Sequence, residues 1–326
     1  PQNVWPQMAM DRGMRALIWF GALAAVMGAI ALLTEGILRI VFGFGHPPLY
    51  VADDTMGYRL APSQQVRRFG NRIAINAYSM RAGAITPQPN PGVFRVFLLG
   101  DSLANGNWWT DQADILSARI AHYLKPQLPA GYSDIEALNA SANSWGPRNE
   151  LAYLERYGTF EAAALVLLLN TDDLFGTQPT ALQVGRDRSY PDHNPSCAIA
   201  EVFSRFFQKN PTIPGLSEIQ SEAGDRVGKN LTAIDGIYQY ARQSGSRFIL
   251  ILSPLKRELP GPRDYELVAR QRLQDWASAN QVAYLDLLPT FQQQPDAEQL
   301  YRDHIHLSKA GNEQVAEIIA KAIHKQ

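Results

Sequence analysis

The chain has 326 residues, of which 46% are hydrophobic and 19% charged, so it can bury a core and is neither disordered nor collagen-like. Its formal net charge of −1 offers no positive excess for binding nucleic acid. One cysteine, Cys197, allows neither an intramolecular disulfide nor a cysteine-based zinc site, and the six histidines form no His-Glu-x-x-His motif. With no P-loop and no Rossmann glycine pattern, we expect chemistry without a metal or an organic cofactor.

The amino-terminal part carries an apolar stretch. Residues 16–33 contain no charged side chain, and a helix of that length rises about 27 Å, close to the hydrocarbon thickness of a bilayer. Arg12 and Arg15 precede the stretch, which favours a cytoplasmic amino end. We therefore predict a cytoplasmic segment 1–15 and a single anchor 16–42 in a bacterial inner membrane, with the remaining chain on the periplasmic side. A cleaved signal peptide is the alternative, because Ala29-Ile30-Ala31 fits a cleavage site.

The next segment, 43–92, is rich in Pro, Gly and Asn and contains a short extended piece at 72–76. These features are typical of a small β-rich connector.

From residue 93 onward, short apolar strands alternate with amphipathic helices. This alternation predicts an open parallel α/β sheet, in which ligands bind beyond the carboxyl ends of the strands. We expect strands at 94–99, 135–138, 165–169, 248–252 and 282–285, and helices at 111–124, 148–157, 230–242, 264–279 and 308–323.

One segment of the 93–326 domain interrupts this rhythm. Residues 173–228 carry several prolines and a single apolar run at 198–207. The segment is interpreted as an insertion, and both a variable surface loop and a cap over the site are consistent with its composition.

The first predicted strand runs into Gly100-Asp101-Ser102. Small residues at such a turn let a serine hydroxyl project from the backbone and leave nearby amides free to face a developing oxyanion. Ser102 is therefore a candidate nucleophile. The competing interpretation is an ordinary turn in which Ser102 caps a helix.

A second pair of polar residues precedes the last predicted helix. Asp303 and His306 are three residues apart, so one turn of backbone can bring both side chains to one point. A carboxylate that binds the Nδ1–H of an imidazole leaves Nε2 free to accept a serine proton. His304 has Tyr301 rather than a carboxylate at the matching position, so we predict His306 as the base.

Together, Gly100-Asp101-Ser102 and Asp303-x-x-His306 resemble the motifs of the SGNH (GDSL-type) family of esterases and acyltransferases, from residue 93 to the carboxyl terminus. The resemblance implies a three-layer, flavodoxin-like open parallel sheet. It also implies Ser102 as nucleophile, His306 as base and Asp303 as the acid that orients it. The family adds an oxyanion hole made of backbone amides and an Asn side chain.

The oxyanion positions depart from the family pattern. The usual glycine of the second block falls on Ser144, with Gly146 nearby, and Asp172 stands where the family has Asn. Because an ionised carboxylate cannot donate a hydrogen bond, three alternatives follow. Asp172 is protonated, Asn170 replaces it, or only the amides of Ser102 and Ser144 act.

Further residues flank these blocks. We predict Asn105, Trp145 and Arg148 as substrate-binding residues, since aromatic rings near a strand end suit a sugar ring, although packing alone would also explain a tryptophan. Resemblance to membrane-anchored members of the family implies an exported esterase or O-acyltransferase. Its substrate would be an acyl ester, in particular an acetyl ester, on envelope or exopolysaccharide, or a small ester. A membrane-bound acyl-transfer partner is implied as well.

A function of another class is the alternative. The altered oxyanion positions are consistent with a catalytically weak or inactive domain that binds polysaccharide or scaffolds an envelope complex.

Overall fold

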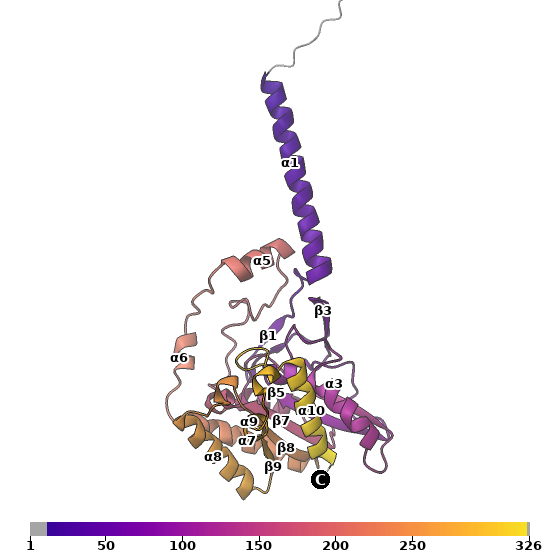
Figure 1. Cartoon of the computed structure of the whole chain (residues 1–326), viewed down its shortest axis with the longest axis vertical. Helices are drawn as coiled ribbons and strands as arrows, with labels where there is room; N and C mark the ends of the chain where they lie inside the picture. Colours follow the sequence, from indigo (N-terminus) through magenta and orange to yellow (C-terminus); the bar gives the residue numbers. More distant parts are fainter. Residues whose placement is uncertain (1–11, 325–326) are drawn as a thin grey trace, which may run out of the picture.

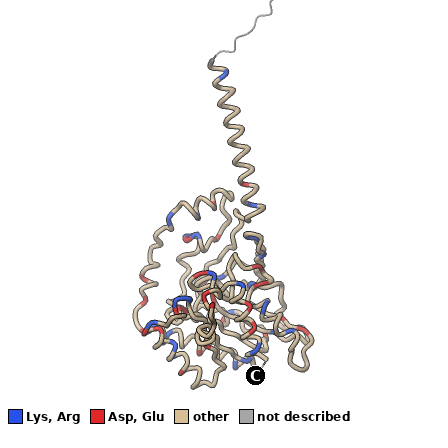
Figure 2. Tube along the Cα trace, viewed as in Figure 1, with Lys and Arg blue, Asp and Glu red and all other residues tan. Residues whose placement is uncertain are grey.

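The computed structural model describes residues 12–324, so most of the predicted segment 1–15 lies outside the described residues. Helix α1 (Arg12–Ile37) continues into a short π-helix, η1 (Leu38–Phe42). Its apolar side chains are exposed on all sides, and the stretch from Gly13 to Phe42 is long and apolar enough to cross a membrane. Figure 1 shows α1 projecting from the rest of the protein, and Figure 2 shows that the middle of this helix carries no charged residue.

Two antiparallel hairpins follow the helix: β1 (Tyr50–Asp53) with β2 (Gly57–Leu60), and β3 (Gln64–Arg68) with β4 (Asn71–Ile75). The extended piece predicted at 72–76 lies almost entirely in β4. The inward side chains of these strands join the core cluster on one face of the main sheet. The segment is therefore packed against the main sheet and is not a loose tether.

The main sheet has five parallel strands in the order β6-β5-β7-β8-β9. The predicted parallel α/β sheet is confirmed, and the five strands fall where the sequence places them. Their bounds are β5 Val93–Gly100, β6 Asp134–Ser141, β7 Ala164–Asn170, β8 Arg247–Ser253 and β9 Ala283–Asp286.

Helices cover both faces of this sheet and form three layers. Along β7, the odd residues 165, 167 and 169 belong to one core cluster and the even residues 164, 166 and 168 to the other, as alternation along a doubly covered strand requires. The first cluster includes residues of α4 (Pro147–Tyr157), α7 (Arg226–Gln243) and α8 (Asp264–Ala279), and the second includes residues of α3 (Leu116–Leu124) and α10 (Lys309–His324).

The helix predicted at 111–124 begins at Leu116, so the prediction was wrong for residues 111–115. The Asp111 carboxylate accepts the N–H of Ala113 and binds the guanidinium of Arg72, which holds a turn instead. The other predicted helices lie within four residues of the observed ends.

The inserted segment after β7 contains η3 (Thr171–Phe175), α5 (Ala198–Phe207) and α6 (Leu216–Gln220). Figure 1 places α5 beside the lower end of α1. The remaining short elements are α2 Ser102–Asn105, η2 Lys125–Gln127, η4 Lys256–Glu258, α9 Leu288–Gln292 and η5 Ala297–Leu300.

Candidate active site

Ser102 lies where the interior strand β5 ends. The preceding Asp101 caps the short helix α2, because its Oδ1 accepts the N–H of Leu103 at 2.8 Å. Gly100 has no room for a side chain, since a Cβ there would come within 2.7 Å of the Leu168 carbonyl oxygen. This tight crossing directs Ser102 to the carboxyl edge of the sheet.

The loop before α10 brings an imidazole to this hydroxyl. His306 Nε2 lies 2.9 Å from Ser102 Oγ, and His306 Nδ1 lies 2.8 Å from Asp303 Oδ2. The loop is closed by a bridge between Tyr301 and Leu307. His304 makes no hydrogen bond to Ser102: its side chain is 84% exposed, and its Nδ1 lies 3.8 Å from Asp303 Oδ1. Of the two histidines, the structure thus places His306 between Ser102 and Asp303.

The carboxylate of Asp303 is suited to holding this ring. Partial burial raises the pKa of Asp303, but hydrogen bonds from the N–H groups of Ile305 and His306 and from the His306 ring outweigh it and leave the pKa below its usual value. The group therefore stays ionised at neutral pH and accepts the Nδ1–H bond.

The loop at Ser144 adopts the geometry expected at a glycine position. Ser144 has a φ of 57°, in the left-handed region that side chains other than glycine rarely adopt. Its hydroxyl accepts a hydrogen bond from Tyr190 of the insertion at 3.0 Å, and the neighbouring Asn143 carbonyl accepts one from Tyr58 of β2. Within the described residues, the N–H of Ser144 has no hydrogen-bond acceptor. Contacts from the insertion and from hairpin strand β2 therefore hold this loop open toward the site.

Two of the predicted oxyanion donors are engaged elsewhere. The N–H of Gly146 donates to Asn149 Oδ1 at 3.1 Å, as part of the start of α4. The Nδ2 of Asn170 donates to Asp101 Oδ2 at 3.0 Å and to Asp173 Oδ2 at 2.8 Å. In this conformation neither group is available to an oxyanion, so the structure does not favour Asn170 or Gly146 as a donor.

Asp172, at the position where the family has Asn, lies at the cavity wall. Its side chain is largely exposed and lies 3.7 Å from the guanidinium of Arg257. Partial burial raises the pKa of Asp172 above its usual value, although the charge of Arg257 opposes this. Of the two amides named as donors, the N–H of Ser144 has no acceptor among residues 12–324, whereas the N–H of Ser102 bonds to the Asp101 carboxylate.

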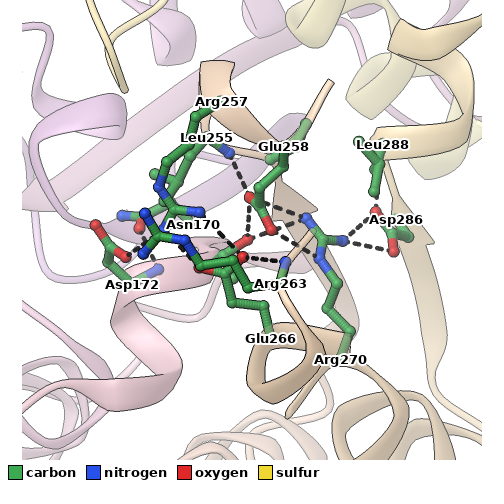
Figure 3. A network of polar contacts seen from close by, with 12 residues as sticks. Asn170, Asp172, Leu255, Arg257, Glu258, Arg263, Glu266, Arg270, Asp286 and Leu288 are labelled. Atoms are coloured by element: carbon green, nitrogen blue, oxygen red, sulfur yellow. Dashed lines mark hydrogen bonds and ion pairs between the residues drawn. The ribbon is translucent and has the colours of Figure 1, made fainter. Parts of the chain in front are cut away.

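A network of ion pairs fixes η3, which carries Asp172 (Figure 3). Thr171 Oγ1 donates to Glu258 Oε2 at 2.7 Å, and Arg270 bridges Glu258 and both carboxylate oxygens of Asp286. The members of this network come from β7–η3, η4, α8 and β9. It therefore ties the ends of three neighbouring strands together beneath the site.

Buried acids lie behind the nucleophile. Burial raises the pKa values of Asp101, Asp173 and Glu150, and the charges of the other acids add to this at Asp173 and Glu150. Asp101 and Asp173 share the Asn170 amide, whereas neither carboxyl oxygen of Glu150 has a hydrogen-bond partner. Glu150 is therefore held as a neutral acid in the folded protein.

This gives a stability prediction with a definite pH dependence. The pKa of Glu150 is raised above its ordinary 4.5 in the folded protein, so folding opposes ionisation of this carboxyl. As the pH rises above 4.5, the carboxyl ionises more readily in the unfolded chain, and the folded protein loses stability relative to it. Glu150→Gln removes this loss without changing the shape of the side chain. Urea unfolding should show the variant about 1–2 kcal/mol more stable than the parent at pH 8 and equal to it near pH 4.5.

The control for this measurement is Glu155→Gln, an exposed acid in the same helix α4. It should leave stability unchanged at both pH values. An equal stabilisation by Glu150→Gln at pH 4.5 and pH 8 would contradict a buried neutral carboxyl.

Ser102 and His306 open into a cavity of about 820 Å³. The insertion forms much of its wall, mostly with polar residues such as Gln178, Gln183 and Asp187. Aromatic side chains complete the wall: Tyr58, Trp108, Trp109 and Tyr190.

The three predicted substrate-binding residues have different positions. Asn105 lines the cavity, but its amide donates to Ser141. Trp145 is only 1% exposed and donates from Nε1 to the Tyr58 carbonyl, so it packs the wall and leaves no open ring face for a sugar. Arg148 binds Glu222 and the Gly176 carbonyl, and so fastens the insertion to α4 rather than reaching the cavity.

Other residues at the site carry no motif that would have revealed them. The ring of Trp109 lies 4.8 Å from the ring of His306, and the guanidinium of Arg302 lies 4.8 Å above Trp109. The proximity of Trp109 to Ser102 in the sequence was the available signal. Among residues 12–324, no three His, Cys, Asp or Glu side chains form a candidate metal site.

Comparison with known proteins gives a consistent result. A profile described as GDSL-like lipase/acylhydrolase family matches residues 98–314. A search of the curated proteins gave no match. Similar solved structures include a lipase/acylhydrolase from Enterococcus faecalis, with 15% identity, 71% of this chain and 95% of that chain covered, and a TM-score of 0.42. They also include the acetyl xylan esterase AlAXEase, with 14% identity, 70% and 99% covered, and a TM-score of 0.43. A third is LAE5, an alpha/beta hydrolase from the metagenome of Lake Arreo, Spain, with 13% identity, 71% and 96% covered, and a TM-score of 0.47.

Proposed function

The chain belongs to the GDSL-like lipase/acylhydrolase family, also called SGNH, and we propose that it is an exported serine esterase or O-acyltransferase acting on acetyl esters of envelope or exopolysaccharide. The observation that carries the proposal is the continuous set of contacts from Asp303 through His306 to Ser102, opening into a large polar cavity. Such a set needs no cofactor to cleave an ester.

The proposed reaction has two halves. Ser102 Oγ attacks the ester carbonyl carbon while its proton passes to His306 Nε2, and the collapsing intermediate takes that proton onto the leaving sugar oxygen. The acyl group is then bound to Ser102 as an ester. Water or a sugar hydroxyl attacks this ester next while His306 Nε2 accepts its proton. The bond between the acyl group and Ser102 Oγ then breaks, and His306 returns the proton to Oγ, which yields hydrolysis or transfer. Asp303 holds the imidazole in the required tautomer throughout.

The negative charge of the intermediate would be met by two amides, those of Ser102 and Ser144. A missing third donor typically costs about a hundred- to a thousandfold in rate, so two donors are consistent with a slow but functional esterase.

The lining of the cavity is better suited to binding a polysaccharide than to binding a long acyl chain. The insertion residues that line it are mainly hydroxyl, amide and charged side chains, and the aromatic rings beside them suit the apolar face of a sugar. A lipase-like site would need a continuous apolar wall for the acyl chain.

We also propose that α1 anchors the protein in the bacterial inner membrane, with the sheet domain on the periplasmic side. Arg12 and Arg15 before the apolar stretch support this orientation. An anchored domain is in turn suited to receive acyl groups from a membrane-bound transfer partner.

The test uses the full chain in detergent with an O-acetylated polysaccharide. We expect release of acetate, or acetylation of an added deacetylated oligosaccharide, and faster turnover of p-nitrophenyl acetate than of p-nitrophenyl decanoate. Preference for the decanoate ester would instead indicate a lipase-like enzyme.

A second function is favoured by one observation. Asp172 stands where the family has a donor, and the Asn170 amide is occupied by two carboxylates. These features suit a domain that binds acetylated polysaccharide or scaffolds an envelope complex without turnover. Binding of the polysaccharide in calorimetry with no acetate release and no acyl-enzyme would favour this function.

A further inference from the structure

Helix α5 of the insertion turns its apolar side chains outward. Ile199, Phe203, Phe206 and Phe207 lie at helical spacing on one face, and all are exposed, Phe206 at 66% and Phe207 at 74%. An exposed cluster of three phenylalanines is unusual on a protein surface facing water and indicates contact with another apolar surface.

The opposite face of α5 buries charge. Glu201 is almost fully buried and pairs with Arg68 of β3 at 2.7 Å and with Arg205 at 2.7 Å. It also accepts the N–H of Gly45 at 2.6 Å. The helix is thus held by ionic contacts on its inner face, so the outward position of its phenylalanines is built into the fold.

The start of α5 is fixed to the end of the apolar helix α1. The Glu35 carboxylate of α1 accepts the N–H groups of Ala198 and Ile199 at 2.8 and 3.0 Å. Glu35 is the first charged residue after the uncharged stretch, so α5 begins at the level where that stretch ends, seven residues before Phe42 at the end of the candidate span. Figure 1 shows the two helices meeting at this point.

Further apolar and aromatic side chains lie at the same level. Ile40 and Val41 of η1 are exposed, and Phe42 packs on Phe69, which packs on Trp108 with ring centres 4.9 Å apart. Aromatic rings gather at the boundary between lipid and water in membrane proteins.

From these contacts we propose that the outward face of α5 lies in the headgroup region of the bilayer that α1 spans, as a second membrane contact. The occupant of this face is phospholipid, because α5 contacts both α1 and η1, and the exposed side chains of these two elements are mostly apolar. Amphipathic helices at membrane surfaces insert their apolar face by about 5–10 Å. The proposal rests on α1 spanning the membrane, and it goes beyond the reaction at Ser102.

This arrangement orients the active site. A cavity of about 480 Å³ at the carboxyl-terminal end of α5, with Phe206 at its edge, shares Arg68, Trp108 and Arg205 with the cavity that contains Ser102. With α5 on the membrane, this side of the site faces the lipid surface.

The test is site-directed spin labelling of the full chain in vesicles of phosphatidylethanolamine and phosphatidylglycerol. Cys197→Ser gives a background without cysteine, and serine can replace the thiol that caps α5 by accepting the N–H of Ala200. Labels are placed at Phe206→Cys, at Leu23→Cys in α1 as the lipid reference, and at Gln271→Cys on the exposed face of α8 as the water reference. Because all three side chains are exposed, the labels should not disturb folding.

The readout is the accessibility of each label to oxygen, which concentrates in lipid, and to a water-soluble nickel chelate. We expect the oxygen-to-nickel ratio at residue 206 to shift toward the value at residue 23 and away from that at residue 271. A water-like ratio at residue 206 with a lipid-like ratio at residue 23 overturns the proposal. Shielding of residue 206 from both reagents also overturns it, since a protein, such as a second copy of this chain, would then cover α5. Ester hydrolysis by the same samples reports separately on the proposed function.

Discussion

Replacement of Ser102 by alanine in the full-length protein should lower kcat/KM for p-nitrophenyl acetate by about 10⁴- to 10⁶-fold, the range seen when a serine nucleophile of this kind is removed. The physical reason is that the hydroxyl 2.9 Å from His306 Nε2 is the group placed to form the acyl-enzyme. Ser102 Oγ also donates to Asp101 Oδ2 at 3.3 Å, a longer contact than the one to His306 Nε2. Steady-state kinetics and mass spectrometry of the acetylated active-site peptide measure the two consequences.

The adjacent histidines supply a matched pair for the same assay. His306→Ala should reduce turnover nearly as much as Ser102→Ala, because the two groups act as a unit. His304→Ala, two residues away in the same loop and largely exposed, should retain the parental rate. Equal activity of Ser102→Ala and the parent, in folded protein, would remove the basis for the serine mechanism.

The parts of the fold and site that follow from local patterns were predictable. Residues 96–99 of β5 and 164–169 of β7 are uninterrupted apolar runs because both faces of the sheet are covered, and such runs are visible in the sequence. The contact between Asp303 and His306 was likewise predictable from their three-residue spacing. Both residues lie in one short loop that the bridge between Tyr301 and Leu307 closes, so no distant segment is needed to bring them together.

Features that depend on distant partners were not predictable. The sequence shows only an arginine at residue 148, whereas its role is set by Glu222 in the insertion. The apolar run at 198–207 was visible, but its outward orientation depends on Arg68 and Glu35, more than a hundred residues earlier. Such long-range ionic contacts leave no periodic signal.

Arg81 is another residue that local patterns did not reveal. It is fully buried at the junction between the hairpins and the sheet domain, and its guanidinium donates to the carbonyl oxygens of Asn105, Asn107 and Thr110. Burial lowers the pKa of Arg81 to about 10, so the group still carries its charge at neutral pH. These three carbonyls belong to the loop that follows Ser102 and carries the tryptophan beside His306. Arg81 therefore shapes the site without touching the reacting atoms.

Arg81→Met should destabilise the protein by about 3–5 kcal/mol, because methionine fills part of the space but leaves buried carbonyl groups without donors. Thermal unfolding should then begin about 6–20 °C lower, given about 2–4 °C per kcal/mol for a domain of this size. Since the loop loses its fixed geometry, kcat/KM should also fall by about 10- to 100-fold at a temperature where the variant is folded. Arg67→Met, at an exposed arginine of β3, is the control and should change stability by less than about 0.5 kcal/mol. If both variants unfold at the parental temperature, the three carbonyls find other donors, and Arg81 does not hold the loop.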